Sequence, residues 1–270
     1  MMPAIKAEFK KLLTVRSSYI LMLGFLLLGG FISFYVHGYK DSGAANFTGQ
    51  SPKDQAGAAL FLASSITSIP NILSVAAALI ALLLLAHEYR YNTVVYTLTA
   101  SNSRSKVLAS KIIAIFGLVL VYTVISTAIL LALVVAGVHA SGHTLPHQNI
   151  NYLAFFAKTV FFTEAFALAG LLFITLIRNQ VGAIAALLIL PNTIEGLLSL
   201  LLKQNSVYMP FMALQQVVQA PVAHITGAPA HPLNDSLGTL TAPKGAVVYL
   251  CYLVVVWIIA WYLFLRRDAT

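Results

Sequence analysis

The chain has 270 residues, of which 59% are hydrophobic and 9% are charged. A soluble globular domain carries about 25% charged residues, so this composition excludes that class and indicates lipid as the solvent. The formal charge of +8 does not indicate a nucleic-acid partner, because the Lys and Arg residues stand in short groups between apolar runs, as membrane topology requires.

Six apolar segments are long enough to cross a bilayer, which takes about 20 residues. We place them at residues 18–36, 57–86, 112–138, 152–177, 181–202 and 246–265. The first run is longer than the core of a signal peptide, about 7–15 residues, and is therefore expected to stay as an uncleaved span. The second is expected to kink at Pro70. The sequence thus predicts an all-α membrane protein, with a single transmembrane domain over residues 1–270.

The distribution of basic residues orients these spans, since Lys and Arg concentrate on the cytoplasmic side. With the N-terminus inside, the inner segments hold eleven of the 16 basic residues: Lys6, Lys10, Lys11, Arg16, Arg90, Arg104, Lys106, Lys111, Arg178, Arg266 and Arg267. The outer segments hold Lys40, Lys53, Lys158, Lys203 and Lys244. Both termini are therefore predicted to be cytoplasmic. An aromatic belt of Trp257, Trp261 and Tyr262 precedes the last two arginines.

Two cytoplasmic segments show helical periodicity. Residues 4–16 carry an apolar stripe beside lysines, which predicts an amphipathic helix in the headgroup region before the first span. Residues 87–106 form the loop after the second span, and Tyr91, Val94, Val95 and Leu98 repeat there at helical spacing. On the outer side, residues 203–244 form the longest connection, and its start, Val207–Val218, is apolar enough to re-enter the membrane or to lie on the outer leaflet.

Catalytic motifs are missing from the sequence. The GxxxxGK[ST] loop that cradles nucleotide phosphates is absent, so ATP hydrolysis by that device is not expected. His87 and Glu88 begin like a zinc-protease helix, but Tyr91 stands where the second His ligand is required. His139, His143 and His147 are spaced by four, yet Gly142 and Pro146 interrupt a helix there, and we expect no metal site. Cys251 lies alone in an apolar run.

Two acidic residues fall inside predicted spans, Glu164 in the fourth and Glu195 in the fifth. A charge at the bilayer centre costs roughly 2.5–3.5 kcal/mol on insertion scales, so such residues face a cavity, a partner or the bundle interior. They are candidates for a substrate path or a subunit interface. A carboxyl group that only fixes helix packing is an equally good interpretation.

The loop after the second span resembles that of the permease subunits of ATP-binding-cassette exporters of the ABC-2 type. Those proteins commonly show a glutamate, an arginine two residues later and a threonine after that, then a leucine, a serine–arginine pair and a lysine that opens the third span. The matching positions here are Glu88, Arg90, Thr93, Leu98, Ser103, Arg104 and Lys111. The segment from Ala7 to Arg16 is similar to the start of the family's first span, and residues 208–214 to its outer segment.

The resemblance implies a half-permease that dimerises, with a second copy or a related chain, and binds two copies of a separate ATPase. ATP and magnesium would sit on that partner, and this chain would hold no cofactor. The family's loop after span two forms a coupling helix that docks on the ATPase, here through Tyr91, Val94 and Leu98, with charged contacts from Glu88, Arg90 and Arg104. The chain would lie in the cytoplasmic membrane of a bacterium and export an amphipathic or hydrophobic drug, peptide or lipid.

Two other classes stay open. An ATP-independent channel or secondary transporter would need its own ion sites, for which Glu164 and Glu195 are sparse material. A membrane-embedded enzyme is disfavoured by the missing nucleophile and ligand constellations. A neighbouring gene that encodes a phosphate-loop ATPase would favour the exporter.

Overall fold

The computed structural model describes residues 2–40, 52–91, 104–142, 151–219 and 240–266, and they are entirely helical apart from short connections. The chain begins with α1 (Met2–Thr14) and α2 (Arg16–Phe31), which a π-helical segment extends (Ile32–Lys40). The long helices α4 (Pro52–Arg90), α6 (Arg104–Ala140) and α7 (Tyr152–Ile177) follow. The chain then forms α8 (Gln180–Ile189), α9 (Glu195–Leu202), α10 (Pro210–Gln219) and α11 (Ala242–Arg266).

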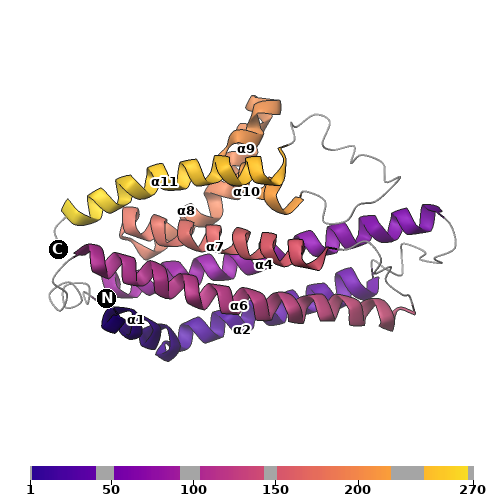
Figure 1. Ribbon diagram of the computed structural model, residues 1–270, viewed down its shortest axis with the longest axis horizontal. Helices are drawn as coiled ribbons and strands as arrows, with labels where there is room; N and C mark the ends of the chain where they lie inside the picture. The colour runs from indigo at the N-terminus through magenta and orange to yellow at the C-terminus, as the bar shows by residue number, and fades with distance from the viewer. Residues whose placement is uncertain (1, 41–51, 92–103, 143–150, 220–239, 267–270) are drawn as a thin grey trace.

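Six helical stretches in the described part are long and apolar enough to cross a membrane, as many as the sequence predicts. They are Arg16–Lys40, Ser68–Arg90, Ser105–Ala140, Tyr152–Ile177, Gln180–Tyr208 and Ala242–Phe264. The start of α1 and the end of α11 lie at the same end of the bundle (Figure 1), as an even number of crossings requires. Which side of the membrane that end faces stays a prediction.

The centre of the bundle is the pair α4 and α7. Of their most apolar stretches, 72% and 67% of residues are buried, against 11–39% in the other four candidate spans. Close packing of the pair depends on Gly170, because a Cβ atom there would collide with the carbonyl oxygen of Ala78 in α4. The outer helices α2 and α11 expose most of their apolar side chains, as surfaces that face lipid or another subunit do.

The helix α4 spans 39 residues, which at 1.5 Å per residue is about 58 Å long. That exceeds the roughly 30 Å hydrocarbon core of a bilayer. The stretch that is apolar enough to cross a membrane, Ser68–Arg90, includes Pro70. The predicted span of residues 57–86 therefore continues in the structure as one helix beyond both of its ends.

The fifth span is interrupted. α8 ends at Ile189, a π-helical turn covers Leu190–Ile194, and α9 resumes at Glu195. Pro191 lies in that turn, and because proline has no backbone N–H, the regular hydrogen-bond ladder cannot continue through it. In Figure 1, α9 points away from the bundle at a steep angle to α4, α6 and α7.

The helix α1 packs against the bundle rather than lying apart from it. Leu12 is 2% exposed and belongs to the main hydrophobic core. The ring of Phe9 lies over Gly117 of α6, where a Cβ atom would approach it to 2.7 Å. The predicted apolar stripe of residues 4–16 is thus used, at these two positions, for contact with the spans. Its depth in the headgroup region stays a prediction.

Candidate functional site

Four charged side chains form a buried ionic cluster where α1, α4 and α6 meet. Lys111 of α6 places its Nζ 2.6 Å from Oε1 of Glu88 in α4 and 3.1 Å from Oε2 of Glu8 in α1. Lys11 of α1 places its Nζ 2.7 Å from Oε1 of Glu88 and 3.2 Å from Oε1 of Glu8. Each ammonium group thus contacts both carboxylates, and the cluster is neutral overall.

The sequence builds this cluster from three helices at simple spacings. Glu8 and Lys11 are three residues apart, so they share one face of α1. Glu88 lies in the last turn of α4, and Lys111 lies two turns into α6. Leu12, Leu85 and Ile115 belong to the apolar core that adjoins these turns.

Because the cluster is buried, the loss of any one of its ion pairs is costly in free energy. Lys111 is 0% exposed, Glu8 4% and Glu88 5%. Removing one partner of such a group leaves an uncompensated buried charge, which costs about 3–5 kcal/mol. The three helices are therefore fixed to one another wherever the cluster is intact.

The pKa of Lys11, which precedes the first span, lies above its ordinary value of 10.5. Partial burial is the largest single influence and lowers it, but the hydrogen bonds and charges of Glu88 and Glu8 together outweigh burial. Lys11 therefore stays protonated at neutral pH and keeps its place in the cluster.

The cluster stands beside both ends of the loop that joins α4 to α6. Arg90 and Tyr91 follow Glu88 directly and are exposed, Tyr91 to 65%, and the Arg90 guanidinium lies 5.6 Å from the Tyr91 ring centroid. The preceding residue, Tyr89, contacts Arg178, which lies at the junction of α7 and α8. The guanidinium carbon of Arg178 is 5.8 Å from the centroid of the Tyr89 ring. The residues that lead into the loop are thus held to the bundle through Tyr89, while Arg90 and Tyr91 remain exposed.

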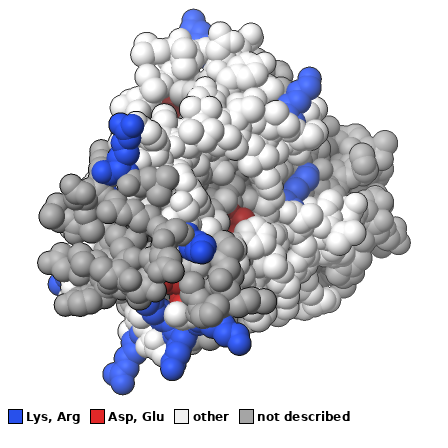
Figure 2. All heavy atoms as spheres, turned by 60° about the vertical axis from the view of Figure 1, so that its left-hand side comes forward, with Lys and Arg blue, Asp and Glu red and all other residues white. Residues whose placement is uncertain are grey.

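Charge is segregated at this end of the bundle, called here the basic end and defined by the exposed side chains of Lys6, Lys10, Arg16, Arg90, Lys106 and Arg266. Figure 2 turns it toward the reader: Lys and Arg protrude, while Asp and Glu atoms show only in recesses. The four glutamates whose side chains the structure describes, at positions 8, 88, 164 and 195, are all at most 5% exposed. The described surface at the basic end is consequently positive.

The structure brings together two of the residues predicted for the coupling loop, Glu88 and Lys111. Arg90 and Tyr91 lie beside them on the surface, and Arg104 is the first residue of α6. Thr93, Val94, Leu98 and Ser103 lie outside the described residues, as do His143 and His147.

Glu8 and Lys11 were not predicted as members of the site. A signal for Glu8 exists in the sequence, because it is the sole acidic residue among the first 40 and stands among lysines. Lys11 carries no comparable signal, since it reads as one more basic residue of the N-terminal segment.

Glu195 caps a helix. Its Oε1 accepts a hydrogen bond from the backbone N–H of Phe211 at 3.1 Å, and its Oε2 accepts one from Met212 at 2.8 Å. These N–H groups belong to the first turn of α10 and would otherwise lack partners. A carboxylate also suits the positive end of the helix dipole. The side chain, 3% exposed, thereby ties the start of α9 to α10.

Glu164 has different surroundings. It is 5% exposed near the middle of α7, and neither carboxylate oxygen has a hydrogen-bond partner within the described ranges. The hydroxyl of the preceding residue, Thr163, likewise lacks one there. A buried polar group without a partner is costly, and such groups concentrate where a protein binds something or moves a proton.

A family model described as ABC-2 family transporter protein matches residues 4–194. The match covers α1 through the π-helical turn after α8, and so includes all four members of the ionic cluster and Glu164. No curated protein sequence matches the chain.

Proposed function

Because the chain belongs to the ABC-2 family of transporter proteins, whose membrane subunits hold no ATPase domain, we propose that it is the permease half of an ATP-driven exporter. It is a multi-pass membrane protein. A separate ATPase subunit would bind and hydrolyse ATP with magnesium, and a second permease copy would complete the transmembrane path. The membrane would be the cytoplasmic membrane of a bacterium.

The observation that carries this proposal is the ionic cluster of Glu8, Lys11, Glu88 and Lys111. An ATPase outside the membrane can drive a permease only if the segment it grips moves together with the spans. The cluster holds the end of α4 and the start of α6 in one rigid group with α1. A movement of the connecting loop would then displace α4. Because α4 packs closely against α7, α7 would move with it.

The exposed Arg90 and Tyr91 would begin the docking surface for the ATPase. Both stand outside the apolar core, and the arginine is oriented by its contact with the tyrosine ring. Glu88, in contrast, is buried and would support the loop from inside rather than touch the partner. The Thr93, Val94 and Leu98 positions of the coupling segment, with Ser103 and Arg104, complete the proposed surface.

Glu164 would belong to the path of the transported molecule or to the interface between permease copies, because its buried carboxyl group has no partner among the described residues. Glu195 would act on the same path indirectly, by fixing α10 to α9. A proton-driven secondary transporter is the second candidate function, and the unpartnered Glu164 is the observation that favours it.

The decisive experiment is coupling in the reconstituted complex. Arg90→Glu reverses an exposed charge beside the loop, and should reduce both ATPase co-purification and permease-dependent ATP hydrolysis. Arg16→Glu, which reverses another exposed charge of the basic end at the start of α2, is the control and should leave both unchanged. Full binding and hydrolysis with Arg90→Glu would contradict the docking role. Transport that persists without any ATPase would favour the secondary transporter.

A further inference from the structure

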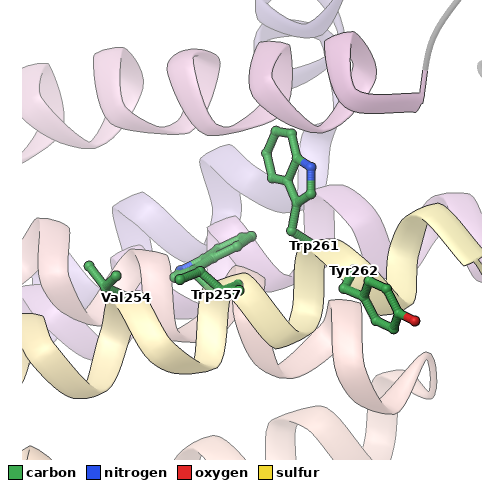
Figure 3. Close-up of a pocket in the computed structure, with 5 residues that line it drawn as sticks. Val254, Trp257, Trp261 and Tyr262 are labelled. Carbon is green, nitrogen blue, oxygen red and sulfur yellow. The ribbon is translucent and has the colours of Figure 1, made fainter.

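An aromatic groove runs along one side of α11 at the basic end. It has a volume of about 410 Å³ and is lined by Val254, Trp257, Ile258, Trp261 and Tyr262. These positions repeat at intervals of three and four residues, so they share one helix face. Figure 3 shows the ring of Trp257 lying along the helix while Trp261 stands away from it. We propose that this groove binds the acyl chain of an anionic phospholipid, with its headgroup held by Arg266.

The position of the groove fits one leaflet of a bilayer. α11 is one of the candidate membrane spans. From Val254 to Arg266 the helix advances by about 18 Å at 1.5 Å per residue, close to half of the roughly 30 Å hydrocarbon core. A lipid with its phosphate at Arg266 would therefore lay its chain along the whole groove toward the midplane.

The lining suits an acyl chain rather than a polar ligand. Val254, Ile258 and Tyr262 are exposed to 54%, 64% and 50%, so the groove opens sideways along the span. The polar atoms of its lining side chains are the two indole nitrogens and the tyrosine hydroxyl. Trp and Tyr with such positions are typical of the membrane interface, where the ring contacts lipid tails.

The positive charge of Arg266, at one end of the groove, favours an anionic headgroup. The Arg266 guanidinium lies 4.6 Å from the ring centroid of Tyr262, which fixes a cation at the end of the groove. Arg266 is exposed, and no carboxylate forms an ion pair with it in the part of the chain that the structure describes. A phosphodiester with a net negative charge supplies the missing counter-ion, and a zwitterionic headgroup supplies it less well.

The surroundings point the same way. The basic end exposes Lys6, Lys10, Arg16 and Arg90, while the described glutamates are buried. The field at this interface therefore attracts anionic lipid in general, and the groove with Arg266 would give it a specific place. This inference depends on α11 as a span and is independent of the ATPase-coupled role proposed above.

The chain offers its own probe for the test. It contains two tryptophans, and both line the groove. The full chain is reconstituted in phosphatidylcholine liposomes that contain a fixed fraction of either brominated phosphatidylcholine or brominated phosphatidylglycerol. Bromine quenches tryptophan fluorescence on contact, so the difference between the two lipids measures headgroup preference in the groove. We expect a preference of about fivefold for phosphatidylglycerol, the ratio that one arginine contributes near an anionic surface.

The variants assign the preference to Arg266. Arg266→Gln should abolish it, and Arg266→Lys, which keeps the charge, should retain it. Lys244→Gln changes an exposed cation at the opposite end of the same helix and should have no effect.

Three outcomes would overturn the proposal. Equal quenching by both lipids would make the groove an ordinary lipid-facing surface. Absence of quenching by either lipid would mean that protein, such as a second copy of the chain, covers the groove. A preference that survives Arg266→Gln would place the anionic site elsewhere.

Discussion

The ammonium nitrogen of Lys111 lies 2.6 Å from a carboxylate oxygen of Glu88, with neither side chain more than 7% exposed. Glu88 lies at the end of one span and Lys111 near the start of the next. Their ion pair therefore fixes the distance between the two helices that the loop connects. Two further charges from α1 close the group. The N-terminal helix α1 thereby helps to fix the two helix ends that the loop connects.

Loss of the lysine should be severe. Lys111→Met leaves two carboxylates with one ammonium group in a buried site, and should lower the free energy of unfolding by about 3–5 kcal/mol. The measurement is the melting temperature of the purified chain in detergent, with Lys106→Met as an exposed control five residues earlier. Adding Glu88→Gln to Lys111→Met should cost less than the sum of the two single changes, because they remove the same interaction. Strict additivity would show that the pair is not coupled.

The stability of the α1 attachment should fall at high pH. The folded-state pKa of Lys11 is raised above 10.5, so its contribution is fully present below that pH and is lost as pH rises through the folded pKa. Melting temperatures of wild type and Lys11→Arg, measured from pH 8 to beyond the lysine range, should coincide at the low end and diverge at the high end, with the arginine variant more stable. Parallel curves would contradict the ion-pair role, since arginine keeps its charge throughout.

Packing at the centre of the bundle should tolerate no side chain at Gly170. Gly170→Ala forces a Cβ atom into the Ala78 carbonyl and should destabilise the protein by about 1–3 kcal/mol, as overpacking does. Gly24→Ala is the matched control, because nothing lies within 4 Å of its added Cβ. If both variants melt with the wild type, α4 and α7 are not in the close contact described above.

A substitution at Glu164 distinguishes a role in transport from a role in helix packing. Glu164→Gln removes the ionisable group but keeps the shape, and if the side chain serves packing alone, stability and export should be unchanged, because the amide fills the same space. If the carboxyl group belongs to the transport path, export should fall while expression and melting temperature hold. The measurement is resistance of a deletion strain, complemented with each variant, to a panel of antimicrobials. Unchanged resistance against every compound that the wild type exports would remove the idea.

The six spans were predictable because the bilayer demands long apolar runs, whatever the tertiary contacts are. The fourth span, for example, matches its prediction at both ends, Tyr152 and Ile177. The π-helical turn around Pro191 in the fifth span was not predicted, although a proline inside an apolar run is a signal for such an interruption.

The ionic cluster was only half predictable, for a physical reason. Glu88 and Lys111 stand out as charges at the edges of apolar runs, but their partners are fixed by tertiary contact, 77 residues away for Lys11 and Glu88 and 103 for Lys111 and Glu8. The capping role of Glu195 was hidden in the same way, because its partners Phe211 and Met212 lie 16 and 17 residues further along the chain. Periodicity reports which face is buried, and says nothing of which buried charges meet.

Site-specific photo-crosslinking tests the central claim most directly. A benzophenone amino acid replaces Tyr91, which is 65% exposed beside the cluster, or Tyr39, which is 47% exposed at the far end of the first span. A phosphate-loop ATPase that co-purifies with the chain is co-expressed, and the adducts are identified by mass. We predict an adduct with the ATPase from position 91 and none from position 39. An ATPase adduct from position 39 alone, or from neither position although the two proteins co-purify, would contradict docking at this loop.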